Sequence, residues 1–232
     1  GVEGAAAMSR LALFDLDNTL LTGDSEVLWL DDLRDRGLLD AALSARNAEM
    51  DRRYRAGEVT AEAFCGFYAA TFAGRTPAQW QPQRDDFFDR VLAPRIPAAA
   101  QALVQQHREA GDLPVLTTAS SRFLTEPSAR ALGFAHVIAT ELEQLPDGRF
   151  SGAPLGTLNM REGKVVRLRS WIAERGLDPE AELARAVFYS DSRNDLPLLR
   201  AVGFPCAVDP DPFLLAEAGR AGWPVLRIHR IS

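Results

Sequence analysis

Apolar and polar residues alternate differently in three parts of the chain. Residues 11–21 form a mostly apolar run that ends in a polar turn, which predicts a buried parallel strand. Residues 24–95 carry apolar side chains at helical spacing, and no strand pattern interrupts them. We therefore predict helical segments over residues 28–37, 38–50, 61–72 and 76–91. Together they indicate a small helical bundle inserted after the first strand.

The second half of the chain alternates between strand and helix patterns. Strands are predicted over residues 113–118, 136–139, 186–189, 205–208 and 224–228, and helices over residues 98–110, 122–132, 164–175, 195–202 and 212–221. Residues 141–144 and 149–152 flank a Pro-Asp-Gly turn at 146–148 and predict a β-hairpin. This order indicates an α/β fold with a doubly wound, Rossmann-like parallel sheet.

The pattern also suggests where the domains begin and end. Residues 8–23 and 96–232 are expected to form the α/β catalytic core, and residues 24–95 a helical cap. Residues 1–7 are interpreted as an expression remnant or a disordered extension. The cap aromatics are expected to form its core, with one or two free to face a substrate: Trp29, Tyr54, Phe64, Phe67, Tyr68, Phe72 and Trp80.

Composition excludes several classes of function. The net charge of −6 argues against sequence-independent nucleic-acid binding, which requires a basic surface. No apolar run reaches the length of a membrane span, and the N-terminus lacks a secretory pattern, so we expect a cytoplasmic protein. Cys65 and Cys206 lie in unrelated contexts and are expected to be buried free thiols.

Polar residues follow three of the predicted parallel strands. Asp15 and Asp17 follow the first, Thr118 ends another and is followed by serines, and Asp191 and Asp195 bracket a turn into a helix. In open α/β sheets, ligands bind beyond the carboxyl ends of the strands. Any one of these residues could be a simple helix cap, but all of them at one sheet edge indicate a single site.

The charges of these residues indicate what the site binds. Ionised carboxylates placed close together repel each other unless a cation lies between them, and Mg²⁺ is the simplest hard divalent ion for oxygen ligands. Arginine supplies all but one of the 26 basic residues, and Lys164 is the only lysine. A single lysine in so arginine-rich a chain suggests a place that requires a compact ammonium group.

These motifs resemble those of a known family. Phe14-Asp-Leu-Asp-Asn-Thr-Leu20, Thr118, Lys164 and Asp191-Ser-Arg-Asn-Asp195 are similar, in this order, to the four motifs of the haloacid dehalogenase-like hydrolases. The helical insertion resembles the phosphoserine phosphatase-like branch. The sequences around Thr118, Lys164 and Asp191 are similar to a bacterial subgroup that includes histidinol-phosphate phosphatases.

The resemblance implies a role for each residue. Asp15 would attack phosphorus and form an aspartyl-phosphate, and Asp17 would act as the general acid and then the general base. Thr118, with its neighbour Ala119, and Lys164 would bind the phosphate. Mg²⁺ would be held by the Asp15 carboxylate, the Asp17 backbone carbonyl and Asp191. Asp195 would orient Lys164 or a metal-bound water, with Asn194 in support.

The substrate is the least determined of these expectations. Asp24 stands where phosphoserine phosphatases carry an acidic residue for the substrate ammonium, although it could equally cap the first helix of the insertion. Arg52, Arg53 and Arg55 are available for a substrate carboxylate, but their surroundings do not match the family's pattern. The preferred substrate is therefore L-histidinol phosphate, which lacks a carboxylate. Phosphoserine hydrolysis and a phosphotransferase reaction remain the alternatives.

Overall fold

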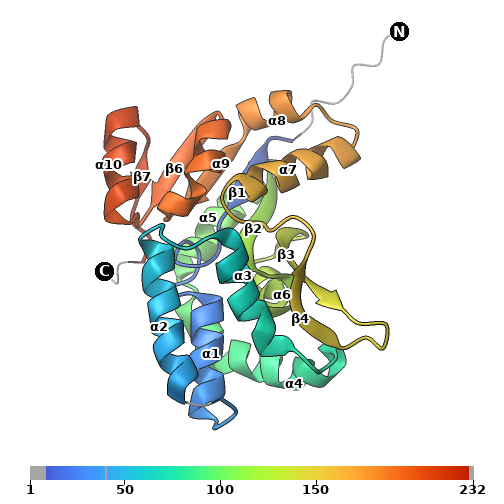
Figure 1. Ribbon diagram of the computed structural model, residues 1–232. Coiled ribbons are helices and arrows are strands. Elements are labelled where there is room, and N and C mark those ends of the chain that lie inside the picture. Colours follow the sequence, from blue (N-terminus) through green and yellow to red (C-terminus); the bar gives the residue numbers. More distant parts are fainter. Residues whose placement is uncertain (1–8, 40, 230–232) are drawn as a thin grey trace.

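The computed structural model describes residues 9–39 and 41–229 (Figure 1). The interpretation of residues 1–7 concerns a part of the chain outside the described residues. A seven-stranded sheet runs through the molecule in the order β4-β3-β2-β1-β5-β6-β7. All neighbouring strands are parallel except β3 and β4, so the predicted doubly wound α/β fold is confirmed. The strands are β1 Leu11–Phe14, β2 Leu113–Ser121, β3 His136–Gln144, β4 Phe150–Leu155, β5 Val187–Ser190, β6 Phe204–Val208 and β7 Val225–Leu226.

Helices cover both faces of this sheet. Helices α5 (Ala98–Glu109) and α6 (Arg122–Ala131) share one apolar core with alternate strand residues such as Phe14 and Leu116. The opposite strand residues, such as Leu13 and Phe188, pack against four helices on the other face. These helices are α7 (Glu162–Glu174), α8 (Pro179–Arg185), α9 (Leu196–Ala201) and α10 (Pro212–Ala221). The alternation of side chains along each strand produces the two cores.

Residues 25–95 are called the helical segment below, and their described part, 25–39 and 41–95, contains no strand. Its helices are α1 (Ser25–Asp35), α2 (Ala41–Arg55), α3 (Ala61–Ala69) and α4 (Pro77–Phe87), followed by the short π-helix η2 (Phe88–Leu92) and the short 3₁₀-helix η3 (Ala93–Arg95). Figure 1 shows these helices grouped together at the end of the molecule where β1 leads into α1. Trp29, Phe72 and Trp80 are buried and continue the apolar core from α6. A separate cluster joins Phe64 and Tyr68 to Met160, just before α7.

The structure differs from the predicted elements in three places. Strand β3 is one nine-residue strand, because residues 136–140 pair in parallel with β2 and residues 141–144 continue the strand and pair antiparallel with β4. Strand β2 continues beyond Thr118 to Ser121. Helix α8 was not predicted, because seven residues are too few to show a helical period, although Asp178 caps it. The hairpin turn at 146–148 is confirmed.

Two smaller predictions also have an outcome. Cys65 and Cys206 are both buried and unpaired, as expected. Among the described residues, no helix is both long and apolar enough to cross a membrane.

Candidate active site

The polar residues predicted from the strand ends meet at one edge of the sheet. Asp15 directly follows β1, and its backbone N–H donates to the carbonyl of Tyr189 in β5 (3.0 Å). The chain then turns sharply through Asn18, which has a left-handed φ of 58° that asparagine tolerates. The turn brings the hydroxyl of Thr19 to 2.9 Å from Asp191 Oδ1 and 3.2 Å from Asp15 Oδ2. Thr19 thus links the two aspartates that follow neighbouring strands.

Lys164 extends into this site from the first turn of α7. Its Nζ lies 3.0 Å from Asp15 Oδ1 and 3.0 Å from Asp195 Oδ1, and the side chain is 2% exposed. Gly163 permits this placement, because a Cβ there would overlap the carbonyl oxygen of Leu158. The lone lysine of the sequence is therefore a buried ammonium group between two carboxylates.

Asp17 is held by donors from two different segments. Its Oδ1 accepts from the backbone N–H of Ser25 (2.7 Å), and its Oδ2 accepts from Ser120 Oγ (2.7 Å) and Thr118 Oγ1 (3.3 Å). These hydrogen bonds fix the carboxylate beside Asp15, at the point where the helical segment meets β2.

The register of β2 decides which threonine faces the site. Thr118 Oγ1 donates to Asp17, whereas Thr117 Oγ1 accepts from Asn159 Nδ2 (3.0 Å) on the other side of the strand. Asn159 Nδ2 also reaches the carbonyls of Thr118 and Ile138 (2.9 and 3.0 Å). Ala119 packs against the Phe64 cluster. Thr118 is thus the threonine that the structure brings beside Asp17.

Burial and mutual repulsion dominate the electrostatics of the site. Burial raises the pKa of Asp15 from 3.8 to about 6; Lys164 opposes this shift, and Asp195 adds to it. For Lys164, burial lowers the pKa, but Asp15 and Asp195 outweigh that effect and raise it. Burial and the nearby Asp15 raise the pKa of Asp191 well above its usual range. One lysine therefore does not offset the negative charge of the site.

This surplus of negative charge fits a divalent cation. Within the described residues, no group of three His, Cys, Asp or Glu side chains is arranged to hold a metal ion. The expected ligand set requires only two side chains, Asp15 and Asp191, and one backbone carbonyl, that of Asp17. In the described part of the chain, Asp191 forms no ion pair with a basic residue, and Thr19 is the only side chain that donates to it. Hard oxygen donors with uncompensated charge are suitable ligands for Mg²⁺.

Two more acidic residues lie where the helical segment begins. Asp24 Oδ1 accepts from the backbone N–H groups of Glu26 and Val27 (2.9 and 3.1 Å) and so caps α1. Glu26 Oε1 accepts from the backbone N–H of Ser121 (2.9 Å), and its Oε2 has no partner among the described residues. Burial, with Asp17 as a further cause, raises the pKa of Asp24 well above normal and that of Glu26 to about 8.

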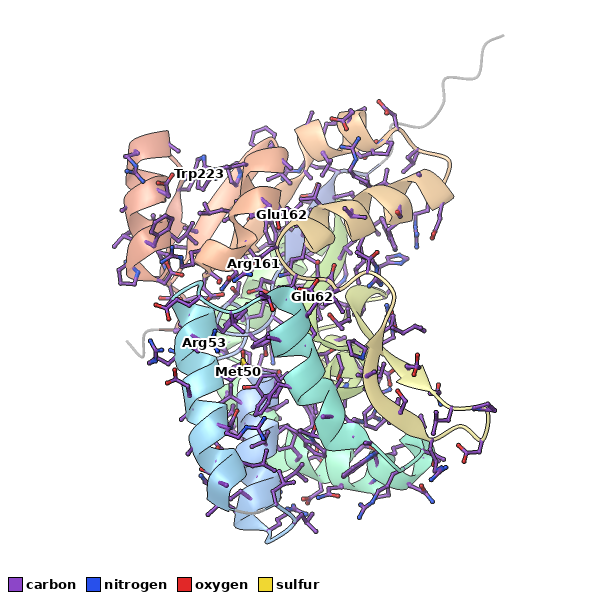
Figure 2. The ribbon with its side chains drawn as sticks, in the orientation of Figure 1. Met50, Arg53, Glu62, Arg161, Glu162 and Trp223 are labelled. Atoms are coloured by element: carbon purple, nitrogen blue, oxygen red, sulfur yellow. The ribbon has the colours of Figure 1, made fainter. Side chains whose placement is uncertain are left out.

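Asn194 connects the Asp191–Asp195 loop to the helical segment. Its Nδ2 donates to the carbonyl of Tyr54 at the end of α2 (2.7 Å), and its Oδ1 accepts from Arg161 Nε (3.1 Å). Arg161 adopts a left-handed φ of 54°, a strained backbone for this residue type. In Figure 2, Arg161 lies where α7 approaches the end of α2 and the beginning of α3.

Sequence reasoning assigned no catalytic or supporting role to several residues that complete the site. Ser120 follows Thr118 by two positions in a strand, so strand alternation could have placed it on the same face. Thr19 is four residues after Asp15 in the same turn. By contrast, Asn159, Glu26 and Arg161 reach the site through tertiary contacts that no local pattern indicates.

Comparisons with known proteins agree with this geometry. The family described as haloacid dehalogenase-like hydrolase matches residues 12–200. The chain is 40% identical over 220 residues to a histidinol-phosphatase of Neisseria meningitidis serogroup C (strain 8013), covering 94% of this chain and 99% of that protein. It is 31% identical over 229 residues to phosphoserine phosphatase SerB1 of Mycobacterium tuberculosis (strain ATCC 25618 / H37Rv), covering 94% of this chain and 70% of that protein.

A solved structure supports the same conclusion. The crystal structure of a protein of unknown function from Bordetella pertussis Tohama I is similar with a TM-score of 0.86 and 43% identity, covering 94% of this chain and 98% of that chain. The family match, the two relatives and this fold confirm the resemblance of the four motifs. The chain belongs to the haloacid dehalogenase-like hydrolase family.

Proposed function

We propose that the protein is a Mg²⁺-dependent phosphomonoesterase that acts through an aspartyl-phosphate on a small amino-alcohol phosphate, with L-histidinol phosphate as the preferred substrate. The observation that carries the chemistry is the Asp15 carboxylate, which is buried at a strand end beside the only lysine of the chain. The choice of substrate draws on the similarity to the Neisseria histidinol-phosphatase along nearly the full length of both chains.

Asp15 is the nucleophile in this proposal. A carboxylate can attack phosphorus without a base to activate it, unlike a serine hydroxyl. Its Oδ1 accepts a hydrogen bond from Lys164 Nζ, and its Oδ2 accepts one from the hydroxyl of Thr19. Attack forms the O–P bond of the aspartyl-phosphate and breaks the bond to the leaving alkoxide. The Lys164 ammonium and the Thr118 hydroxyl stabilise the charge on the phosphoryl oxygens.

Asp17 moves the protons. It gives a proton to the leaving alkoxide and then takes one from the water that hydrolyses the aspartyl-phosphate. The hydrogen bonds from Ser25, Thr118 and Ser120 hold its carboxyl group in one orientation. An acid/base residue in this place favours hydrolysis over a phosphotransferase reaction, in which water must be excluded.

Asp15, Asp191 and the Asp17 carbonyl would hold the Mg²⁺ ion. When bound, the ion supplies positive charge that offsets the charge on the transferring phosphoryl group. The unpaired charge of Asp191 supports this assignment. Removal of divalent ions with EDTA is expected to abolish phosphate release, and added Mg²⁺ is expected to restore it.

The arginines of the helical segment support a substrate without a carboxylate. Arg52 pairs with Glu49 (2.7 Å), Arg53 donates to the carbonyl of Glu58 (3.3 Å), and Arg55 pairs with Asp51 (3.1 Å). These contacts already use the guanidinium groups that a substrate carboxylate would need to pair with. Asp24 caps α1 through Oδ1, and no donor to Oδ2 is found among the described residues, so Oδ2 is available to a substrate ammonium group.

A substrate panel tests the proposal. L-histidinol phosphate and O-phospho-L-serine are compared by phosphate release with Mg²⁺, and the first is expected to have a much higher kcat/KM. Preference for phosphoserine would favour the alternative suggested by the similarity to SerB1. Transfer of the phosphoryl group to an added alcohol at a rate above hydrolysis would indicate a phosphotransferase. No phosphate release from either ester would overturn the phosphatase assignment.

A further inference from the structure

Tyr54, near the end of α2, is tied to the catalytic edge through its backbone. Its carbonyl accepts from Asn194 Nδ2 (2.7 Å), one residue before the Asp195 that pairs with Lys164. Asn194 is itself held by Arg161 Nε (3.1 Å) and by Ser192 Oγ (3.2 Å). The backbone of Tyr54 is therefore fixed relative to the catalytic residues by two core elements, the loop after β5 and the start of α7.

The Tyr54 side chain is held by the helical segment itself. Its ring stacks on Phe64 with centroids 4.4 Å apart and planes 24° from parallel. Phe64 is buried and packs edge-on against Tyr68, so it is a rigid support. One face of the Tyr54 ring is thus covered by the helical segment.

The Tyr54 hydroxyl, by contrast, has no hydrogen-bond partner among the described residues. Burial is the main cause that raises the pKa of Tyr54 well above its usual range. The negative charges of four aspartates raise it further, those of Asp195, Asp15, Asp191 and Asp24. The phenol is consequently neutral and able to donate. This donor has no acceptor among the described residues, and Asn194 fixes its backbone at the catalytic edge, so the hydroxyl is suited to a bound ligand.

We infer that Tyr54 is a specificity-determining residue, which contacts the leaving-group alcohol of the substrate through its hydroxyl and the exposed part of its ring. This inference rests on the proposed phosphatase function. The nearby carboxylates and the electron-rich ring face favour a cationic ammonium or imidazolium group on the alcohol and disfavour a carboxylate.

Two variants separate the hydroxyl from the ring. Tyr54→Phe keeps the stack on Phe64 and loses the donor, and Tyr54→Leu loses both. Their kinetics are measured with L-histidinol phosphate and with acetyl phosphate, whose leaving group is too small to reach the helical segment. Phe67→Leu is the control for packing, because Phe67 lies on α3 under Arg46 and packs against Tyr68 in the same apolar cluster as Tyr54, but its replacement leaves the ring and the hydroxyl of Tyr54 in place.

The expected result is a change in selectivity. Tyr54→Leu should raise KM for histidinol phosphate roughly tenfold and Tyr54→Phe about threefold, while kcat changes by less than about twofold. Activity on acetyl phosphate should stay within about twofold for both variants and for Phe67→Leu. A purely structural role for Tyr54 would reduce activity on the two substrates equally.

The outcomes distinguish this inference from the proposed function. Unchanged KM for histidinol phosphate in Tyr54→Leu, or equal losses on both substrates, would overturn the role of Tyr54 and leave the phosphatase intact. If the unmodified enzyme releases phosphate from neither substrate, the proposed function and this inference both fail.

Discussion

The two sides of the site balance their charges in different ways. On the side of the sheet, Asp15 and Asp195 share the ammonium group of Lys164. On the side of the helical segment, Asp24 and Glu26 are equally buried, but in the described part of the chain neither forms an ion pair with a basic side chain. In the proposed reaction, the sheet side provides a fixed cation for the phosphoryl anion. The other side has buried carboxyl oxygens without a cation among the described residues, and these can accept hydrogen bonds from a substrate ammonium group. We therefore propose that the sheet side carries out the chemistry and that the helical segment selects the alcohol.

The most severe test of the sheet side is Asp15→Asn. We expect kcat to fall below about a hundredth of the original value, because an amide cannot attack phosphorus. The fold should persist, since the amide can still accept from Lys164. Phosphate release measures the activity and circular dichroism the fold. A variant that keeps more than a hundredth of the rate would exclude Asp15 as the nucleophile.

Lys164→Arg tests whether activity requires a compact ammonium group between Asp15 and Asp195. Arginine keeps the charge, but its planar guanidinium does not fit a fully buried space between two carboxylates. Activity should fall roughly 10²-fold. Arg169→Lys is the control: it is an exposed residue of the same helix that pairs with Glu180, and its exchange should leave the kinetics unchanged. Normal kinetics for Lys164→Arg would show that the single lysine is not required.

Glu26→Gln tests the helical side of the site through the pH dependence of the free energy of unfolding. The folded pKa of Glu26, about 8, is above its ordinary value of 4.5, so the folded state binds the proton more tightly than the unfolded state. The stability from this group is full below the ordinary pKa and is lost as pH rises through the folded pKa. Glutamine keeps the acceptor for Ser121 and does not titrate.

The free energy of unfolding, measured by urea at each pH, gives the result. Between about pH 6 and pH 7.5, the free energy of unfolding of the original protein should fall by about 2 kcal/mol more than that of Glu26→Gln. Glu62→Gln, an exposed change on α3, should follow the original protein. Parallel pH curves for the original protein and Glu26→Gln would contradict the raised pKa of Glu26.

The smallest expected effect is that of Ser120→Ala, at the boundary between the two sides. It removes the 2.7 Å hydrogen bond to Asp17 but keeps those from Ser25 and Thr118. We expect kcat to fall about tenfold with little change in KM, because proton transfer depends on the orientation of Asp17. Ser151→Ala on β4 is the control. A change confined to KM would place Ser120 in substrate binding instead.

The sequence alone determined the parallel sheet and the residues at its carboxyl edge. Asp15, Asp17, Thr118, Asp191 and Asp195 could be brought together before the structure, because parallel strands present their carboxyl ends at one edge. Even Lys164 was indicated by its being the only lysine. These inferences depend on local spacing, composition and one general rule of topology, which a single sequence contains.

Only the tertiary structure decided how the helical segment meets that edge. Asn194 and Tyr54 are 140 positions apart, Ser121 and Glu26 are 95 apart, and His229 reaches the carbonyl of Thr19 across 210 positions (2.6 Å). The register of β2 places Thr118 beside Asp17 and turns Thr117 toward Asn159. Local periodicity specifies which face of an element is apolar, but not the direction in which two distant elements approach, because that direction follows from the packing of all of them together.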